Sequence, residues 1–256
     1  RPSKSAGGSQ GGITAAPELP DFSRFGPTRR EKVSQIRRIT AENTQAAWQV
    51  VPHVTQHDEA EVDAVEEFRQ TYKEGVAKAG GKLTVTVILL KIVAKALEKF
   101  PRFNSSVDMD AGEIIYKEYI NVGVAVDTDR GLLVPVVRDV DQKSLTELSV
   151  ELSELAGKAR DKKLSPKDME GGNFTISNLG GIGGTAFTPV VFAPQVAILG
   201  VARAKQVPVY VDGDFVPRLM LPLSLSYDHR AVDGADGARF LRWICEALEH
   251  PMSMSL

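Results

Sequence analysis

The sequence has a single cysteine, Cys245, among its 256 residues. One thiol cannot form a disulfide within the chain, which excludes a disulfide-held fold and suits a reducing compartment. Long apolar runs are also missing, because the most apolar stretch, residues 83–96, is interrupted by two threonines and two lysines. A membrane-spanning helix needs about 20 apolar residues, so we expect none. The first residues do not have the pattern of a signal peptide, and because the sequence begins at Arg1 rather than Met we expect it to be part of a longer protein.

An excess of charge of either sign is absent as well. The 31 lysines and arginines nearly balance the 33 aspartates and glutamates, and the net charge is −2. This balance argues against a protein that binds nucleic acid or an acidic membrane. With 43% hydrophobic and 25% charged residues, the composition is that of a globular protein with one large domain or two small ones.

The composition changes about 20 residues into the chain. Residues 1–20 are rich in Gly, Ser, Pro and Ala and have few large apolar side chains, which predicts a flexible linker. The remainder, residues 21–256, has the composition of a folded domain. The basic segment from Arg29 to Arg38 is typical of a solvated surface, although it would also suit contact with phosphates or with a neighbouring subunit.

The hydrophobic periodicity predicts helices and strands that alternate irregularly along the folded part. Ser144 and Glu147 form a capping box at the start of one helix. The predicted helices span residues 39–48, 63–79, 84–100, 144–164 and 234–250, and a short one begins at Ser165. The predicted strands span residues 53–62, 114–126, 132–137, 173–179, 196–201 and 218–227. This order predicts an α/β or α+β fold with a mixed β-sheet flanked by helices.

The end of the last predicted strand carries a candidate catalytic residue. Apolar and other residues alternate up to Asp228, His229 follows at once, and Asp233 with Gly234 opens an amphipathic helix. A strand that delivers one imidazole to a loop anchored at both ends is a suitable way to present a general base. The same residues also suit an ordinary strand end, with Asp233 acting only as a helix N-cap. The pattern alone leaves both interpretations open.

A second distinctive segment begins at Phe174. Thr175 and Ser177 alternate with apolar residues, which places two hydroxyl groups on one face of a strand. Four glycines between residues 180 and 184 then allow a backbone to pass close to another group, although a glycine-rich turn without function would look the same. A dinucleotide-binding loop is disfavoured, because Pro189 and Pro194 exclude the helix that would bind the pyrophosphate.

Three other residue types are better explained by structure than by chemistry. Cys245 lies in a predicted helix without a histidine at helical spacing, so we interpret it as a packed residue. His53 and His57 have the spacing of helical metal ligands, but they lie in a predicted strand, where about 13 Å separates them. We therefore predict no metal site. Trp48 and Trp243 are expected to pack in a core or at an interface.

The segment around His229 and the segment around Ser177, with their flanks, resemble the acyltransferase core of 2-oxo-acid dehydrogenase complexes. The resemblance is carried by Leu223–Gly234 and Phe174–Gly180, and by the Phe-Thr-Pro and Ala-Ile-Leu-Gly stretches that end at Pro189 and Gly200. Further matches lie at residues 51–56, 103–106, 131–136 and 141–145, so the resemblance covers residues 22–256. The details are most similar to the acetyltransferases of pyruvate dehydrogenase complexes. The shorter His-x-x-x-Asp-Gly element is shared with chloramphenicol acetyltransferase.

This resemblance implies a chloramphenicol acetyltransferase-like fold and a catalytic and assembly domain over residues 21–256. It implies that His229 is the general base that takes a proton from the thiol of coenzyme A or of dihydrolipoamide, that Ser177 binds the oxyanion, and that Asp233 fixes the histidine loop. It also implies trimers whose active sites lie between two subunits, with the histidine and the serine on different chains. The positions expected to contact coenzyme A are Arg69, Leu199 and Gly200.

The resemblance further implies partners. We expect trimers to assemble into a hollow cubic particle of 24 chains, held together by the apolar tail at Met252–Leu256. Lipoyl domains would deliver the acyl group, and an upstream domain absent from this sequence would bind the decarboxylase and dihydrolipoyl dehydrogenase subunits. The expected compartment is the cytoplasm, or the mitochondrial matrix in a eukaryote. Three alternatives to this function remain. The chain could transfer succinyl or branched-chain acyl groups by the same chemistry, act as a free-standing small-molecule acetyltransferase, or be an inactive structural core.

Overall fold

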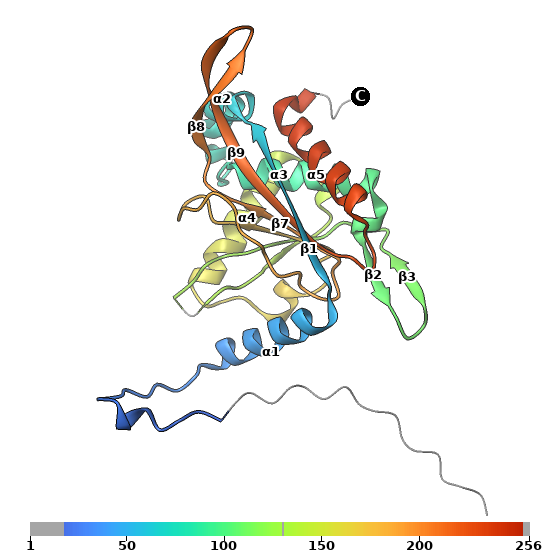
Figure 1. Ribbon diagram of the computed structural model, residues 1–256. Helices are drawn as coiled ribbons and strands as arrows, with labels where there is room; N and C mark the ends of the chain where they lie inside the picture. The colour runs from blue at the N-terminus through green and yellow to red at the C-terminus, as the bar shows by residue number, and fades with distance from the viewer. Residues whose placement is uncertain (1–17, 130, 253–256) are drawn as a thin grey trace, which may run out of the picture. The chain divides into compact units, whose positions relative to one another are not determined.

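The computed structural model describes residues 18–129 and 131–252 and separates into two units, Arg1–Val33 and Ser34–Leu256 (Figure 1). In the first unit a short 3₁₀ helix, η1 (Phe22–Arg24), is capped by Asp21, whose carboxylate accepts hydrogen bonds from the hydroxyl and the backbone N–H of Ser23. Most of the predicted linker, residues 1–17, lies outside the described residues. All the elements discussed below belong to the second unit.

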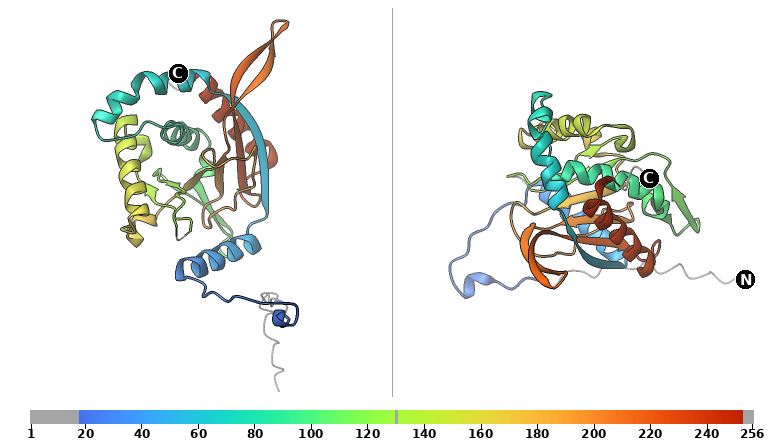
Figure 2. Two further views of the ribbon diagram at one scale, coloured as in Figure 1. Left: turned by 90° about the vertical axis from the view of Figure 1, so that its left-hand side faces the viewer. Right: turned by 90° about the horizontal axis from the view of Figure 1, so that it is seen from above.

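A mixed seven-stranded sheet forms the centre of the second unit, as the sequence predicts. Its order is β1-β9-β7-β6-β4-β5, and β8 pairs with the distal part of β9. β4, β6 and β7 run parallel, whereas the other neighbouring pairs are antiparallel. The β8–β9 hairpin extends beyond the rest of the sheet (Figures 1 and 2). The strands are β1 (His53–Glu61), β4 (Val122–Val124), β5 (Val136–Val137), β6 (Phe174–Asn178), β7 (Ala197–Val201), β8 (Lys205–Val211) and β9 (Asp214–Asp228).

The described part of the second unit contains five α-helices, and each of them was predicted within a few residues. α3 is buried on most sides, as its nearly continuous apolar sequence indicates, and it packs against α4, α5 and β6. α5 packs along β1 and β9. The helices are α1 (Gln35–Val50), α2 (Asp63–Lys78), α3 (Val85–Lys99), α4 (Leu145–Arg160) and α5 (Gly234–Glu249), with 3₁₀ helices η2 (Pro101–Asn104), η3 (Val140–Gln142) and η4 (Pro166–Met169). No helix of the described residues is long and apolar enough to cross a membrane.

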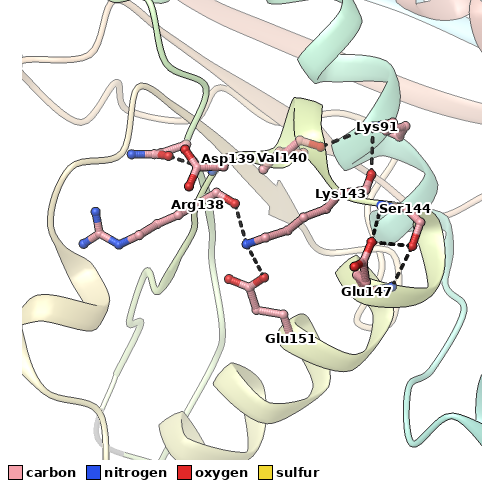
Figure 3. A network of polar contacts seen from close by, with 9 residues as sticks. Lys91, Arg138, Asp139, Val140, Lys143, Ser144, Glu147 and Glu151 are labelled. Carbon is pink, nitrogen blue, oxygen red and sulfur yellow. Dashed lines mark hydrogen bonds and ion pairs between the residues drawn. The ribbon is translucent and has the colours of Figure 1, made fainter.

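The turn that leads into α4 is fixed by polar contacts that start from a lysine on α3 (Figure 3). Lys91 donates hydrogen bonds to the backbone carbonyls of Asp141 at 2.7 Å and Lys143 at 2.8 Å. The predicted capping box of α4 is confirmed, because Ser144 and Glu147 exchange side-chain and backbone hydrogen bonds. These contacts join the buried helix to the start of its neighbour.

Two strand predictions were wrong in extent. The single strand predicted at residues 114–126 is divided into β3 (Glu113–Tyr116), which pairs with β2 (Ser105–Asp108) in a separate sheet, and the short β4. The side chain of Asn104 holds the chain between them, donating to the carbonyls of Lys117 at 2.7 Å and Tyr119 at 3.1 Å. In place of the strand predicted at residues 132–137, the structure has only the two-residue strand β5 and one isolated bridge, between Val126 and Leu133. Periodicity also missed β2 and β8.

The structure places the other residues that the sequence analysis singled out. Cys245 is buried in the core, where desolvation raises the pKa of its thiol. His53 and His57 both lie on β1, and the described residues contain no group of three metal-ligating side chains that could hold an ion. Trp48 does not pack in the core of this chain, since the residue is 65% exposed and stacks on His53, and the interface expected as the other possibility stays a prediction.

Candidate active site

His229 follows the last residue of β9 without an intervening loop. Its backbone N–H donates a 3.1 Å hydrogen bond to the carbonyl of Pro52, immediately before β1. The loop is therefore tied to the neighbouring strand, while the residue itself is exposed. An exposed imidazole on a backbone fixed by its own sheet is suited to proton transfer with a bound molecule.

The residues on either side of His229 make a contact that the sequence analysis missed. The carboxylate of Asp228 is only 2% exposed and accepts hydrogen bonds from the guanidinium of Arg230, the shortest at 2.6 Å. The backbone N–H of Arg230 donates to the same carboxylate at 2.9 Å. This pair raises the pKa of the Arg230 guanidinium. The Asp228–Arg230 pair holds the backbone around the histidine in place. The opposite charges on either side of His229 in the sequence could have indicated this pair.

Asp233 occupies the N-cap position of α5, as predicted, with extended backbone angles (φ −84°, ψ 159°). Its side chain nevertheless makes no capping hydrogen bond. No ion pair of Asp233 with an arginine occurs among the described residues either, and the nearby Arg230 is bound to Asp228. Neither a capping bond nor an arginine pair of Asp233 therefore fixes the loop within the part of the chain that the structure describes, and the exposed carboxylate of Asp233 is available to another partner.

Ser177 lies near the end of β6 and is 8% exposed. Thr175 shares its face of the strand and donates a 2.7 Å hydrogen bond to the side-chain oxygen of Gln195. The glycine-rich loop that follows is held by Arg203, whose guanidinium donates to the carbonyls of three loop residues, Gly180, Gly181 and Ile182, at 2.9–3.1 Å. Sequence reasoning missed Arg203, which orders the backbone next to Ser177.

Within one chain, Ser177 and His229 lie at opposite ends of the sheet. Ser177 is level with Gly200 of β7, which is in turn level with Ser224 of β9. His229 comes five residues after Ser224. At about 3.3 Å per residue along a strand and about 4.8 Å between strands, the two positions are about 19 Å apart. A single chain therefore cannot present both side chains to one reacting group.

The three positions expected to contact coenzyme A are not equivalent in the structure. Gly200 is adjacent to Ser177 and on the same face of the sheet. The side chain of Leu199 is fully buried in the core, so only its backbone can reach a ligand. Arg69 lies on α2, which packs against α3 and α5, and its guanidinium is bound to Glu66 at 2.6 Å. The structure thus brings Gly200 and the backbone of Leu199 next to Ser177.

A mixed sheet of this topology defines the class of chloramphenicol acetyltransferase-like folds. Chloramphenicol acetyltransferase itself matches with a TM-score of 0.51 over 81% of this chain and 92% of its own, at 16% identity. The family model for the 2-oxoacid dehydrogenases acyltransferase (catalytic domain) matches residues 25–256. The chain belongs to this family.

Similar curated proteins are dihydrolipoyllysine-residue acetyltransferase components of pyruvate dehydrogenase complexes. That of Haemophilus influenzae is 49% identical over 95% of this chain and 43% of the relative, and that of Pseudomonas aeruginosa is 50% identical over 96% and 45%. This chain thus spans less than half the length of these relatives. The solved dihydrolipoamide acetyltransferase of Azotobacter vinelandii matches with a TM-score of 0.92 at 49% identity, over 95% of this chain and all of that one. The solved cubic core of the pyruvate dehydrogenase multienzyme complex matches equally well.

Proposed function

We propose that this chain transfers an acetyl group between the dihydrolipoyl arm of a lipoyl domain and coenzyme A, as part of the core of a pyruvate dehydrogenase complex. The observation that carries the proposal is the spacing of three residues. In the Azotobacter vinelandii enzyme a serine, a histidine and an asparagine were investigated for their role in catalysis, and the histidine follows the serine by 52 positions and precedes the asparagine by four. The same intervals separate Ser177, His229 and Asp233, with aspartate in the place of asparagine.

In this proposal His229 removes the proton from the attacking thiol, because the thiolate is the nucleophile and a free thiol has a pKa of about 8.5. The thiolate attacks the carbonyl carbon of the thioester, and the tetrahedral intermediate carries a negative oxygen. Ser177 donates its hydroxyl hydrogen to that oxygen. When the intermediate collapses, the carbon–sulfur bond of the original thioester breaks and the leaving thiolate takes the proton back from His229. General-base help is worth about 10²–10⁴-fold.

The separation of about 19 Å between Ser177 and His229 supports an active site shared by two chains of a trimer. In that arrangement His229 of one chain faces Ser177 of its neighbour. The carboxylate of Asp233, which makes no capping bond in its own chain, is available to fix the loop against the neighbouring subunit. Coenzyme A would lie along Gly200 and the backbone of Leu199, and Arg69 would bind it after releasing Glu66.

We further propose that the trimers form a 24-chain cubic particle, which the cubic core of the similar complex supports. Residues 1–20 would link the domain to upstream lipoyl and subunit-binding domains, through which the decarboxylase and dihydrolipoyl dehydrogenase components attach. Because the similar curated proteins are bacterial, we assign the chain to the cytoplasm rather than to a mitochondrial matrix.

The test is an acyl-transfer assay with purified protein. Dihydrolipoamide is mixed with acetyl-, succinyl- or isobutyryl-coenzyme A, and formation of the new thioester is followed. We expect the purified protein to transfer the acyl group without any other enzyme. We also expect a clear preference for acetyl-coenzyme A. A preference for succinyl or isobutyryl groups would move the chain to another branch of its family. Transfer to chloramphenicol but not to dihydrolipoamide would refute the proposed function.

A further inference from the structure

Four residues form a row across one face of the sheet and end at Ser177. His57 of β1 is directly opposite Ser224 of β9, Ser224 is opposite Gly200 of β7, and Gly200 is opposite Ser177. Directly opposite residues of neighbouring strands share a face, so all four lie on the side away from the core that α3 and α5 cover. The row therefore connects the candidate oxyanion donor to a histidine that the proposed mechanism does not use.

Polar contacts join the far end of the row to the glycine-rich loop. Nδ1 of His57 lies 2.9 Å from Oγ of Ser224, whose side chain is buried with only 1% exposure. The same Oγ accepts a long hydrogen bond, 3.5 Å, from the backbone N–H of Phe187. Phe187 belongs to the segment that follows Ser177 and the glycines. His57 and Ser224 thus hold the backbone of this segment at Phe187.

The ring of Phe187 occupies the place that Gly200 leaves vacant. A Cβ atom at Gly200 would lie 2.7 Å from Cζ of this ring and 3.1 Å from both Cε atoms. Gly200 is therefore required because the ring lies directly over it, between Ser224 and Ser177 in the row. Phe187 is only half-buried, so one side of the ring stays accessible. A cavity of about 310 Å³ lined by His57, Thr185 and Ala186 adjoins this segment.

We propose that His57 and Ser224 are positioning residues that hold Phe187 over Gly200, and that the Phe187 ring forms a wall of the passage along which the coenzyme A arm reaches Ser177. The inference rests on the proposed function, because that function brings coenzyme A to the Phe187 ring that covers Gly200. His57 and Ser224 do not touch the substrate, and they act through Phe187. Their loss leaves the groups that perform the chemistry in place and loosens one wall of the binding passage.

The matched variants are Ser224→Ala and His57→Phe, which remove the polar contact, and His57→Asn, which keeps a hydrogen-bonding group near the position of Nδ1. Thr55→Val is the control. Oγ1 of Thr55 makes the equivalent contact with Oγ of Ser226 at 2.8 Å, two residues further along the same pair of strands, and no contact with Phe187 involves it. We expect Ser224→Ala and His57→Phe to raise KM for coenzyme A about fivefold, the effect of one lost hydrogen bond. We expect kcat and KM for dihydrolipoamide to stay within about twofold, and His57→Asn and Thr55→Val to match the parent.

A double-mutant cycle separates positioning from general destabilisation. Phe187→Leu removes the wall itself and should raise KM for coenzyme A. If Ser224 acts through Phe187, adding Ser224→Ala to Phe187→Leu has no further effect on KM. Additive effects, or a fall in kcat with unchanged KM, would overturn the proposal.

A second readout does not depend on activity. Amide hydrogen exchange over residues 179–190 should accelerate in Ser224→Ala and His57→Phe but not in His57→Asn. If the parent protein does not transfer acetyl groups, the proposed function is refuted. The hydrogen-exchange result would then still test whether His57 and Ser224 hold Phe187. A parent that transfers acetyl groups, together with unchanged exchange in both variants, would refute the positioning role alone.

Discussion

At the scale of the residue, the two candidate catalytic side chains differ in how the fold presents them. His229 is exposed on a backbone that the Asp228–Arg230 pair and Pro52 hold in place. Ser177 is nearly buried at the end of β6, beside an ordered glycine-rich loop. The exposed ring can be truncated without disturbing the core, whereas the serine is best changed by removing its oxygen atom only.

Replacing His229 with alanine should abolish acetyl transfer and leave the melting temperature nearly unchanged. The reason is that the ring contributes little to packing but supplies the general base, whose loss costs about 10²–10⁴-fold. Steady-state assay with acetyl-coenzyme A and dihydrolipoamide, combined with thermal unfolding, checks both statements. Retention of more than about a tenth of the parent activity would remove His229 from the mechanism.

Replacing Ser177 with alanine should lower kcat about 10²-fold with little change in KM. A hydrogen bond to the oxyanion strengthens only in the transition state, so its loss affects the chemical step and not substrate binding. The kinetic constants for coenzyme A and dihydrolipoamide are measured separately. An effect confined to KM for coenzyme A would make the serine a binding residue instead.

At the scale of the element, α3 shows how a charged side chain is accommodated in an almost entirely apolar helix. Lys91 directs its ammonium group to backbone carbonyls of the turn that leads into α4 (Figure 3). Desolvation lowers the pKa of this lysine, but its donors satisfy carbonyls that the turn leaves without backbone partners. The contact fixes α4 relative to the buried helix.

Lys91→Met should therefore lower the free energy of unfolding by about 1–3 kcal/mol, the cost of leaving buried acceptors without donors. The matched control is Lys95→Met on the same helix. Lys95 forms only a half-exposed pair with Glu98, and loss of such a pair costs less than about 1 kcal/mol. Denaturant unfolding of the two variants measures the difference, and equal losses would show that the carbonyl contacts of Lys91 contribute nothing special.

At the scale of the whole molecule, the separation of Ser177 and His229 makes assembly a condition of activity. A site built from two chains has a direct consequence for mixed assemblies. Chains carrying His229→Ala and chains carrying Ser177→Ala are each inactive, but a site that combines the intact serine of one with the intact histidine of the other is complete.

Refolding equal amounts of these two variants together should recover about a quarter of the parent activity, because each of the two required residues is intact in half of the chains. The two variants refolded separately and then combined serve as the control for simple mixing. Activity no higher than that of the separate variants would place both residues of a working site in one chain.

The C-terminal tail belongs to the same scale. Met252 is 80% exposed, and residues 253–256, which complete the predicted apolar plug, lie outside the described residues. Deleting Met252–Leu256 should give active trimers that no longer form large particles, because an exposed apolar tail is stabilised by insertion into a neighbouring trimer. Analytical ultracentrifugation and the transfer assay check the two halves of this statement. A truncated chain that still forms particles would show that other surfaces join the trimers.

The sequence by itself determined the features that depend on neighbours along the chain. The helix starts at Thr84 and Ser144, the buried character of α3 and the strand that leads to His229 all follow from local periodicity and capping. The family resemblance likewise rests on contiguous motifs. The four-residue strand β2 was missed, and so was the longer β8, because β8 contains Pro208 and gains its stability from pairing with β9.

Only the tertiary structure decided which distant residues meet. The contact between His57 and Ser224 joins positions 167 residues apart, and the place of Phe187 over Gly200 depends on the order and register of the strands. The separation of Ser177 and His229 has the same origin, because β9 runs antiparallel to β7 and carries its last residue to the opposite end of the sheet. Strand order and register are long-range pairings that no local pattern specifies, so the sequence named the candidate catalytic residues while the fold determined that one chain keeps them apart.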